Sequence, residues 1–221
     1  MINIVVALPE EARPLIDHYR LKRLHSCKAF PVYTSSDIQL IVSGIGKINA
    51  ATATGFLAAY NPVGYTAAWL NLGIAGCGNR QLGTAVLASR VTDAVSGRHF
   101  FPSILFEFEF DAAYIRCVNN PVNTYEDNSV IDMESAGFYP AAMRFSTVEL
   151  IHCCKIISDN EAAPLETFDK TRVVDLVSEQ LPFIDGVIIG LAAMTQTLLP
   201  NDAIAGLIRT TTVKVRLTSS R

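Results

Sequence analysis

Short runs of consecutive apolar residues, rich in Val and Ile, alternate along the chain with stretches of helical character. Several of these runs are apolar at nearly every position, which is typical of strands in a sheet that is buried on both faces. The runs predict strands at Ile2–Leu8, Ile38–Val42, Trp69–Gly73, Thr84–Ser89, Tyr114–Val118, Ser129–Met133 and Glu149–Ile157. The stretches between them predict helices at Glu10–Tyr19, Lys47–Tyr60, Ser135–Phe145, Thr167–Gln180 and Gly186–Leu198.

The alternation of strands and helices, with short connections, sets the expected fold class. It predicts an α/β protein with three α/β/α layers, in which helices cover a mixed, largely parallel central sheet. No low-complexity tract, long charged run, Gly/Ser linker or internal repeat divides the sequence, so we expect residues 1–221 to form a single domain. Beyond Ala203 the pattern is ambiguous, because Thr210–Val215 favours a strand by propensity and a terminal helix is equally tenable.

Composition limits the class of protein further. Half of the 221 residues are hydrophobic, 18% are charged and the formal net charge is −3. Disordered chains are polar and highly charged, and proteins that bind nucleic acid through bulk charge are basic, so we expect neither. The five cysteines are irregularly spaced and include no C-x-x-C pair, which predicts buried free thiols rather than disulfides or a zinc site. The apolar surplus predicts either a large core or a buried subunit interface.

The apolar runs are also too short for a membrane protein. The most apolar stretch, Gly186–Met194, soon meets Thr195, well short of the roughly 20 residues that cross a bilayer. The N-terminal run Met1–Leu8 has no basic lead-in and is interrupted at once by Pro9, which argues against a signal peptide. We therefore expect a soluble cytoplasmic protein with no membrane and no nucleic-acid partner.

Candidate chemistry is concentrated in the turns that follow the predicted strands. In open α/β sheets, ligands bind at the carboxyl ends of the strands, where these turns converge. The informative turns are Pro9–Glu11, Ser43–Lys47, Asn71–Gly76, Asp132–Ser135 and Ile157–Asn160. Three of them contain a carboxylate, the group that serves as an acid, a base or an acceptor for hydroxyl groups.

Each turn also has a plainer structural interpretation. Ser43–Lys47 can hold an anion at a helix N-terminus, but it lacks the Walker and dinucleotide spacings and equally fits a tight turn with an exposed lysine. Glu134 can accept two hydrogen bonds from a vicinal diol or interact with a helix dipole. Ser158–Asn160 can supply an acid or only an N-cap.

In their order along the chain, these turns resemble the nucleoside phosphorylase/nucleosidase superfamily, closest to the branch of 5′-methylthioadenosine/S-adenosylhomocysteine nucleosidases. The resemblance covers roughly residues 1–95 and 129–198 and is carried by Ala7–Glu11, Val42–Ala51, Asn71–Gly76, Asp132–Ala136 and Ile156–Asp159. It implies a nucleoside phosphorylase-like fold and hydrolysis of the N-glycosidic bond of a purine nucleoside or a modified nucleoside. It also implies a homo-oligomer, a dimer or higher. We expect no metal and no organic cofactor, because the His and Cys residues form no ligand cluster.

The resemblance implies roles for individual residues. Asp159 is the acid that protonates purine N7, so we expect it in a desolvated pocket that keeps its proton near neutral pH. Glu11 positions and activates the attacking water, with Glu10 held in reserve, while Glu134 binds the ribose 2′- and 3′-hydroxyls and Met133 packs on the ribose. The remaining candidates for substrate binding are Ile74, Gly76, Ser158, Gly46, Lys155, Arg98, His99 and Phe101.

Hydrolysis is favoured over phosphorolysis because of the turn after the first strand. Phosphorylases of this superfamily hold phosphate with basic side chains, and their Gly-Asp-Pro-x-Arg segment is replaced here by Pro9–Glu11. Arg13 and Arg80 lie near the candidate turns, so a phosphorylase stays as the alternative. Lys155 stands where the family often carries Arg, and it either pairs with a site carboxylate or snorkels to the surface.

Two departures from the family pattern leave a third alternative, a non-catalytic purine-binding relative. Ile74 stands where the nucleosidases usually have a hydroxyl residue, which removes a polar contact. The segment between Asp93 and Val130 is shorter than the usual insert that helps build the base pocket. Within it, Phe100, Phe101 and Tyr125 can stack on a base or pack against the core or a partner subunit. The sequence therefore does not identify the nucleoside.

Overall fold

The computed structural model describes residues 1–60, 67–105, 107, 109–122, 124–125, 127–163 and 170–198. Its strands are β1 (Ile2–Val6), β2 (Lys22–Arg23), β3 (Val32–Thr34), β4 (Ile38–Val42), β5 (Ala68–Gly76), β6 (Ala85–Asp93), β7 (His99–Phe100), β8 (Ala112–Cys117), β9 (Val130–Asp132) and β10 (Ile151–Asp159). Its helices are α1 (Pro9–His18), α2 (Lys47–Tyr60), α3 (Ser135–Ala142), α4 (Lys170–Glu179) and α5 (Leu181–Leu198), with a 3₁₀ turn at Val148–Leu150.

The strands form one mixed sheet in the order β10-β6-β8-β9-β5-β1-β4-β3-β2, and β7 pairs with the end of β6. Strands β4, β1, β5 and β10 run parallel to one another, so their carboxyl ends lie at one edge of the sheet. Because β10 pairs with β5 as well as with β6, strands β10, β6, β8, β9 and β5 close into a ring. At the carboxyl end of β5, Gly76 pairs with Ile131 of β9 on one side and with Asp159 of β10 on the other.

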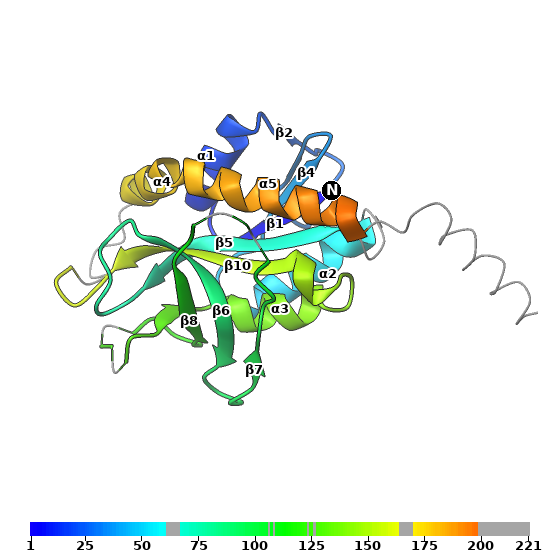
Figure 1. Ribbon diagram of the computed structural model, residues 1–221. Coiled ribbons are helices and arrows are strands. Elements are labelled where there is room, and N and C mark those ends of the chain that lie inside the picture. The colour runs from blue at the N-terminus through cyan, green and yellow to red at the C-terminus, as the bar shows by residue number, and fades with distance from the viewer. Residues whose placement is uncertain are drawn as a thin grey trace, which may run out of the picture.

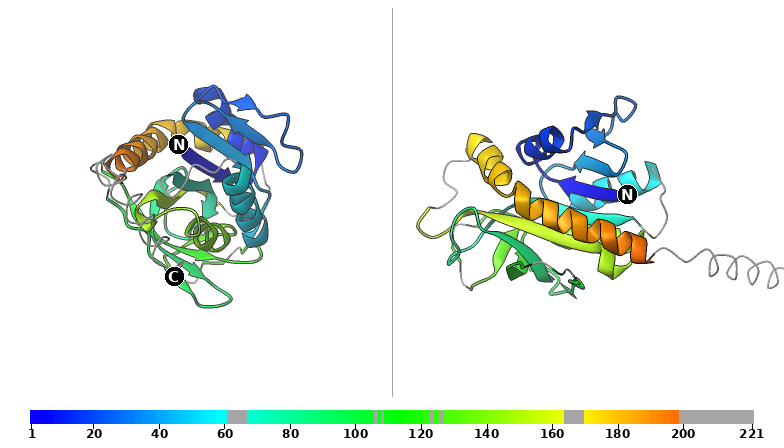
Figure 2. Two further views of the ribbon diagram at one scale, coloured as in Figure 1. Left: turned by 90° about the vertical axis from the view of Figure 1, so that its right-hand side faces the viewer. Right: turned by 45° about the horizontal axis from the view of Figure 1, so that its top comes forward.

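Side chains that alternate along the central strands pack into two cores, one on each face of the sheet. In β5, Trp69 and Ala75 join the core under α2 and α3, whereas Leu70 and Leu72 join the core under α1, α4 and α5. The two groups of helices lie on opposite sides of the sheet in Figure 1, and Figure 2 shows the same layers from two further directions. The predicted α/β fold with a mixed central sheet is confirmed, and the five cysteines are buried and free, as expected.

All predicted strands are present, and β4 and α2 have the predicted bounds. The short strands β2, β3 and β7 were not predicted, because two or three residues are too few to show an alternating pattern. Helix α5 begins at Leu181 rather than Gly186, since Pro182 is tolerated in a first turn whose N–H groups have no helical partner. The start of the predicted helix Thr167–Gln180 and the C-terminus from Ala203 lie outside the described residues.

Helix α5 is long and apolar enough, by length and composition alone, to cross a membrane, with a mean hydropathy of 1.5 over 18 residues. The apolar run Gly186–Met194 is too short to cross a bilayer by itself, but the helix that contains it spans 18 residues. One face of α5 packs on the sheet through Val187 and Leu191, which are fully buried. Near its start, Asp185 accepts a hydrogen bond of 2.6 Å from the hydroxyl of Tyr19, which fixes α5 against the end of α1.

Candidate active site

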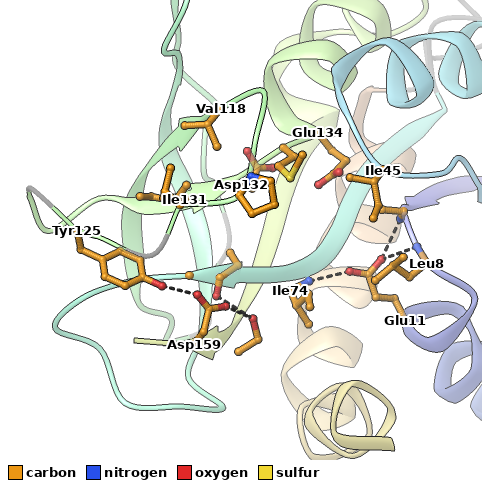
Figure 3. A pocket seen from close by; sticks show the side chains of 17 residues that line it. Leu8, Glu11, Ile45, Ile74, Val118, Tyr125, Ile131, Asp132, Glu134 and Asp159 are labelled. Carbon is orange, nitrogen blue, oxygen red and sulfur yellow. Dashed lines mark hydrogen bonds between the residues drawn. The ribbon is translucent and has the colours of Figure 1, made fainter. Parts of the chain in front are cut away.

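A cavity of about 300 Å³ lies at the carboxyl edge of the sheet and contains the three carboxylates that the sequence analysis singled out. Glu11 lies at one end of it, Asp159 at the other, and Glu134 faces it from the start of α3 (Figure 3). The residues that line it are Ala7, Leu8, Glu11, Ile45, Ile74, Ala75, Gly76, Val118, Pro121, Val122, Tyr125, Ile131, Asp132, Met133, Glu134, Ser158 and Asp159. The cavity is therefore mostly apolar, with acidic groups on separate sides.

Glu11 is held by backbone N–H groups from two strand ends. Its Oε2 accepts hydrogen bonds of 2.9 Å from Ala7 and Leu8, which follow β1, and its Oε1 accepts one of 2.9 Å from Ile74 in β5. The side chain fits because Gly73 has no Cβ, which would lie 2.8 Å from Oε1. Glu11 is only 2% exposed, and burial raises its pKa to about 7 although the N–H donors lower it.

The neighbouring Glu10 points away from this cavity. Its Oε1 lies 2.9 Å from Nζ of Lys170 in α4, and this hydrogen bond lowers the pKa of Glu10. Successive residues in a helix point about 100° apart, so Pro9 at the start of α1 directs only one of the two glutamates to the sheet edge. The structure thus places Glu11, and not Glu10, at the site.

Glu134 precedes the first residue of α3, yet its side chain turns into the cavity rather than capping the helix. Its Oε1 accepts a hydrogen bond of 2.8 Å from the backbone N–H of Gly46, whose φ of +103° favours glycine. Helices α2 and α3 approach closely here, because a Cβ on Gly137 would overlap the carbonyl oxygen of Lys47. Burial raises the pKa of Glu134.

The turn Ser43–Lys47 therefore serves a carboxylate of the site. Its N–H group at Gly46 is taken by Glu134, so the proposed anion site at this helix N-terminus is not supported. The exposed lysine of the alternative interpretation is not found either. The side chain of Lys47 is only 19% exposed, and its Nζ lies 2.6 Å from Oδ1 of Asp93. This pairing ties the start of α2 to the end of β6.

Lys155 lies behind the cavity wall and pairs with Asp132. Its Nζ is 2.9 Å from Oδ2 of Asp132, and both side chains are excluded from solvent. Asp132 also accepts hydrogen bonds from Ser135, 2.9 Å from its N–H and 2.7 Å from its Oγ. Lys155 holds the pKa of Asp132 low, and the acidic groups Asp132 and Glu134 raise the pKa of Lys155 despite its burial. Of the two alternatives, Lys155 pairs with a carboxylate of the site and does not snorkel.

Asp159 ends β10 and is 5% exposed. Its Oδ1 accepts a hydrogen bond of 2.6 Å from the hydroxyl of Ser158, and its Oδ2 accepts one from the hydroxyl of Tyr125. Gly76 makes room for this pair, because a Cβ there would lie 2.5 Å from Oδ2 of Asp159. Asn160 then closes a turn, with its Oδ1 accepting a hydrogen bond from Ala163, so Ser158–Asn160 is not the N-cap of a helix that starts there.

The remaining predicted contacts divide into two groups. Met133, Ile74, Gly76 and Ser158 line the cavity, and Gly46 contributes its N–H to Glu134. Arg98, His99 and Phe101 do not line it, and their role as substrate contacts stays a prediction. The β6–β7 hairpin directs them outward: the Arg98 guanidinium lies 5.2 Å from the ring of Phe100, Nδ1 of His99 is 2.9 Å from Oγ1 of Thr92, and Phe101 is 64% exposed.

The apolar wall of the cavity is what the sequence analysis missed. It consists of Ala7, Leu8, Ile45, Ala75, Val118, Pro121, Val122 and Ile131. The hydrophobic pattern does not distinguish such residues at strand ends from core residues. Leu8 nevertheless lies next to the candidate turn Pro9–Glu11, and Ile45 lies within the candidate turn Ser43–Lys47. The sequence assigns Asp132 no role, and the available signal is its position three residues before Ser135, whose N–H and hydroxyl both donate to its carboxylate. Of the three aromatic candidates, Tyr125 alone lines the cavity.

Within the described part of the chain, no arginine or lysine lines the cavity. Lys155 is neutralised behind Asp132, and Arg80 pairs with Asp111 at the surface. Arg13 lies outside the cavity, beside α4. The described residues also hold no group of three or more His, Cys, Asp or Glu side chains arranged to bind a metal ion. Any ligand of this cavity therefore meets apolar walls, backbone groups, carboxyl groups and the hydroxyl-bearing side chains of Tyr125 and Ser158.

No protein-family model matches the sequence, and no curated protein sequence matches it. Solved structures do match. The 5′-methylthioadenosine/S-adenosylhomocysteine nucleosidase of S. pneumoniae, solved with the transition-state inhibitor MT-ImmA, is 18% identical over 86% of this chain and 99% of that one, with a TM-score of 0.69. The corresponding nucleosidase of Colwellia psychrerythraea 34H, in complex with adenine, is 17% identical over 86% and 94%, with a TM-score of 0.67.

A futalosine hydrolase of Helicobacter pylori strain 26695 is also similar, at 13% identity over 85% of this chain and 97% of that one, with a TM-score of 0.64. At such low identity these likenesses concern the fold. The chain has the fold of the nucleoside phosphorylase/nucleosidase superfamily, as the sequence resemblance predicted.

Proposed function

We propose that this protein hydrolyses the N-glycosidic bond of a purine nucleoside or a modified nucleoside. The observation that carries the proposal is that Glu11, Glu134 and Asp159, which come from separate elements of the chain, line one cavity. The fold shared with hydrolytic nucleosidases supports it. So does the cavity itself, whose apolar walls suit a base and a sugar ring.

Asp159 and Glu11 divide the acid and base roles between them. Asp159 gives a proton to N7 of the base, the C1′–N9 bond breaks and its electron pair goes to the base. Water attacks C1′ and gives its proton to Glu11, so that the products are the free base and the free sugar. The positions of Asp159 and Glu11 at opposite ends of the cavity support this division, as does a pKa of about 7 for Glu11, which suits a base near neutral pH.

Glu134 is proposed to hold the ribose hydroxyls between these two groups. One of its oxygens accepts the Gly46 N–H, which leaves acceptor positions on both oxygens for a vicinal diol. Met133, the residue before it, lines the cavity and supplies an apolar surface for the sugar. A negative charge beside the ribose also stabilises the oxocarbenium-like transition state of the bond cleavage.

Hydrolysis is favoured over phosphorolysis by the charge of the cavity. A phosphate nucleophile needs cationic or N–H donors, and the three N–H groups around the Glu11 carboxylate already donate to it. Because no described arginine or lysine lines the cavity, a phosphate ion there would meet carboxylates. A neutral water molecule meets no such repulsion.

The test is base release from a panel of nucleosides in phosphate-free buffer, followed by chromatography. We expect release of a free base from at least one ribonucleoside and its loss in Asp159→Asn. Release that depends on added phosphate and yields ribose 1-phosphate would instead identify a phosphorylase. Purine binding without turnover would identify a non-catalytic relative.

We also propose that the protein acts in the cytoplasm on a small-molecule nucleoside, without nucleic acid or membrane, as a homo-oligomer. The buried free thiols support a reducing compartment. Two isoleucines beside the cavity support an oligomer, since Ile45 is 50% exposed and Ile48 is 82% exposed. Sedimentation of the purified protein tests the oligomer, and a monomer at micromolar concentration would contradict it.

A further inference from the structure

We propose that Tyr125 competes with the substrate base for Asp159, so that a purine enters the site by displacing the tyrosine hydroxyl. The inference builds on the proposed function, because it takes Asp159 as the group that meets the base. It concerns a side chain that the resemblance assigned no role beyond possible stacking. Three features of the structure carry it.

The first feature is the way the two oxygens of Asp159 are used. Oδ1 accepts from the adjacent hydroxyl of Ser158, 2.6 Å away, and this contact belongs to β10 itself. Oδ2 accepts from the hydroxyl of Tyr125, which reaches it from the segment between β8 and β9 (Figure 3). The oxygen that Ser158 leaves available is therefore the one that Tyr125 covers.

The second feature is that the end of β5 is shaped to receive this tyrosine. A Cβ on Gly76 would lie 2.6 Å from the Tyr125 hydroxyl, and a Cβ on Gly78 would lie 2.7 Å from the Cβ of Tyr125. Neither glycine has a positive φ, so the backbone conformation does not require glycine at either position. The space that Tyr125 and Asp159 occupy does require it. The contact is thus built into the end of the strand.

The third feature is the chemistry of the phenol. Its environment is acidic, because Asp159 and Glu161 face it, and burial together with Asp159 raises the pKa of Tyr125. The phenol therefore keeps its proton at any working pH and acts as a donor to Asp159. The base meets Asp159 differently, because N7 is itself an acceptor and needs a proton on the carboxyl oxygen that faces it. An oxygen that carries this proton is a poorer acceptor for the phenol, so the phenol and the base compete for one position. Tyr125 is half-buried.

Competition of this kind lowers the apparent affinity for the base. A single hydrogen bond contributes net free energy that changes an equilibrium by up to about 10-fold. Base binding must break that bond before it can form its own. Removing the hydroxyl while keeping the ring should therefore tighten binding of the base, which is the opposite of what loss of a substrate contact would do.

The experiment compares the wild-type protein with Tyr125→Phe in calorimetric titrations with adenine. We expect adenine to bind up to about 10-fold more tightly to Tyr125→Phe, and KM for any nucleoside substrate to fall as well. Tyr114→Phe is the matched control, because Tyr114 is 55% exposed on β8 and lies outside the cavity, so adenine affinity should stay unchanged. Unchanged or weaker adenine binding by Tyr125→Phe overturns the inference.

A second variant and a structure make the test independent of that one substitution. Gly78→Ala places a methyl group 2.7 Å from the Cβ of Tyr125 and 3.3 Å from Oε1 of Glu161, and by displacing Tyr125 it should tighten adenine binding as well. A crystal structure with adenine should show the base at Oδ2 of Asp159 and Tyr125 turned away, whereas a Tyr125–Asp159 contact that survives beside bound adenine overturns the inference. Tighter adenine binding without base release from any nucleoside would sustain this inference and refute the proposed hydrolysis.

Discussion

Nζ of Lys155 lies 2.9 Å from Oδ2 of Asp132, and the pair is sealed between β10 and β9 directly behind the proposed ribose position. The ammonium group also faces Glu134, so one lysine balances two acidic groups of the site. The pair ties the end of β9 to the middle of β10, the two strands that present Asp132 and Asp159 to the cavity. The site therefore rests on a charge that does not line the cavity.

Replacing Lys155 by Met should destabilise the protein strongly. It leaves Asp132 as a buried carboxylate without its ion-pair partner, and such a loss lowers the free energy of unfolding by about 3–5 kcal/mol. Lys170→Met removes the exposed ion pair with Glu10, in which Lys170 is 74% exposed, so the loss there should stay below about 1 kcal/mol. Urea unfolding of both variants checks this, and equal effects would contradict a structural role for the buried pair.

Asp159→Asn should lower kcat by about 10²–10⁴-fold, because an amide cannot deliver a proton to the base. Single-turnover measurements of base release give this value directly. Asp111→Asn is the matched control, since Asp111 pairs with Arg80 at the surface and lies outside the cavity. A kcat that survives in Asp159→Asn would show that another group protonates the base.

Glu134→Gln should weaken the use of ribonucleosides more than that of 2′-deoxyribonucleosides. A diol donates two hydrogen bonds to a carboxylate. A hydrogen bond to a charged group contributes about 1.5–3 kcal/mol of net free energy, and the neutral amide of Gln forfeits part of that contribution. The comparison is the ratio of kcat/KM for the two sugars in the wild type and in the variant. An equal loss for both sugars would remove the ribose assignment of Glu134.

The pKa of about 7 for Glu11 predicts the acid limb of the pH profile. Water activation needs the ionised carboxylate, so kcat/KM should rise with pH through about 7 and level off above it. A profile already level at pH 5 would show that no base with this pKa takes part. The reaction can be followed in phosphate-free buffers of constant ionic strength.

The same pKa predicts that ionisation of Glu11, which raises activity as pH rises, lowers the stability of the folded protein. The folded pKa is above the unfolded value of 4.5, so the folded state holds the proton more tightly and is favoured below pH 4.5. This contribution is lost as pH rises through about 7 and amounts to at most about 3 kcal/mol. The unfolding free energy of the wild type minus that of Glu11→Gln isolates it, since the other carboxylates are common to both proteins. A difference that stays constant between pH 5 and 8 would contradict the prediction.

Gly73→Ala should impair catalysis through Glu11. The added Cβ would lie 2.8 Å from Oε1 of Glu11 and push the carboxylate away from the Ile74 N–H, so we expect kcat to fall by about 10-fold or more. Gly55→Ala is the control, because nothing lies within 4 Å of a Cβ there and alanine in α2 adds up to about 1 kcal/mol of helix stability. Unimpaired turnover in Gly73→Ala would show that the position of Glu11 is not critical.

The sequence determined the elements whose pattern is local. β4 and α2 have the predicted bounds, because a continuous apolar run and a long helical stretch identify themselves without reference to the rest of the chain. The acidic turns were recognised because they follow such strands, and the parallel order of the strands implied that their ends would meet. The roles of Glu11, Glu134 and Asp159 came from the resemblance and not from the pattern.

Tertiary structure decided everything that depends on which segments meet across the sheet. The strands β2, β3 and β7 exist only as partners of longer neighbours, and the hairpin that carries Arg98 could point toward the site or away from it. The burial of Lys155 against Asp132 and the contact of Tyr125 with Asp159 each join residues that are far apart in sequence. Their distances follow from strand register and from the glycines that allow close approach, and neither quantity is encoded in a local pattern.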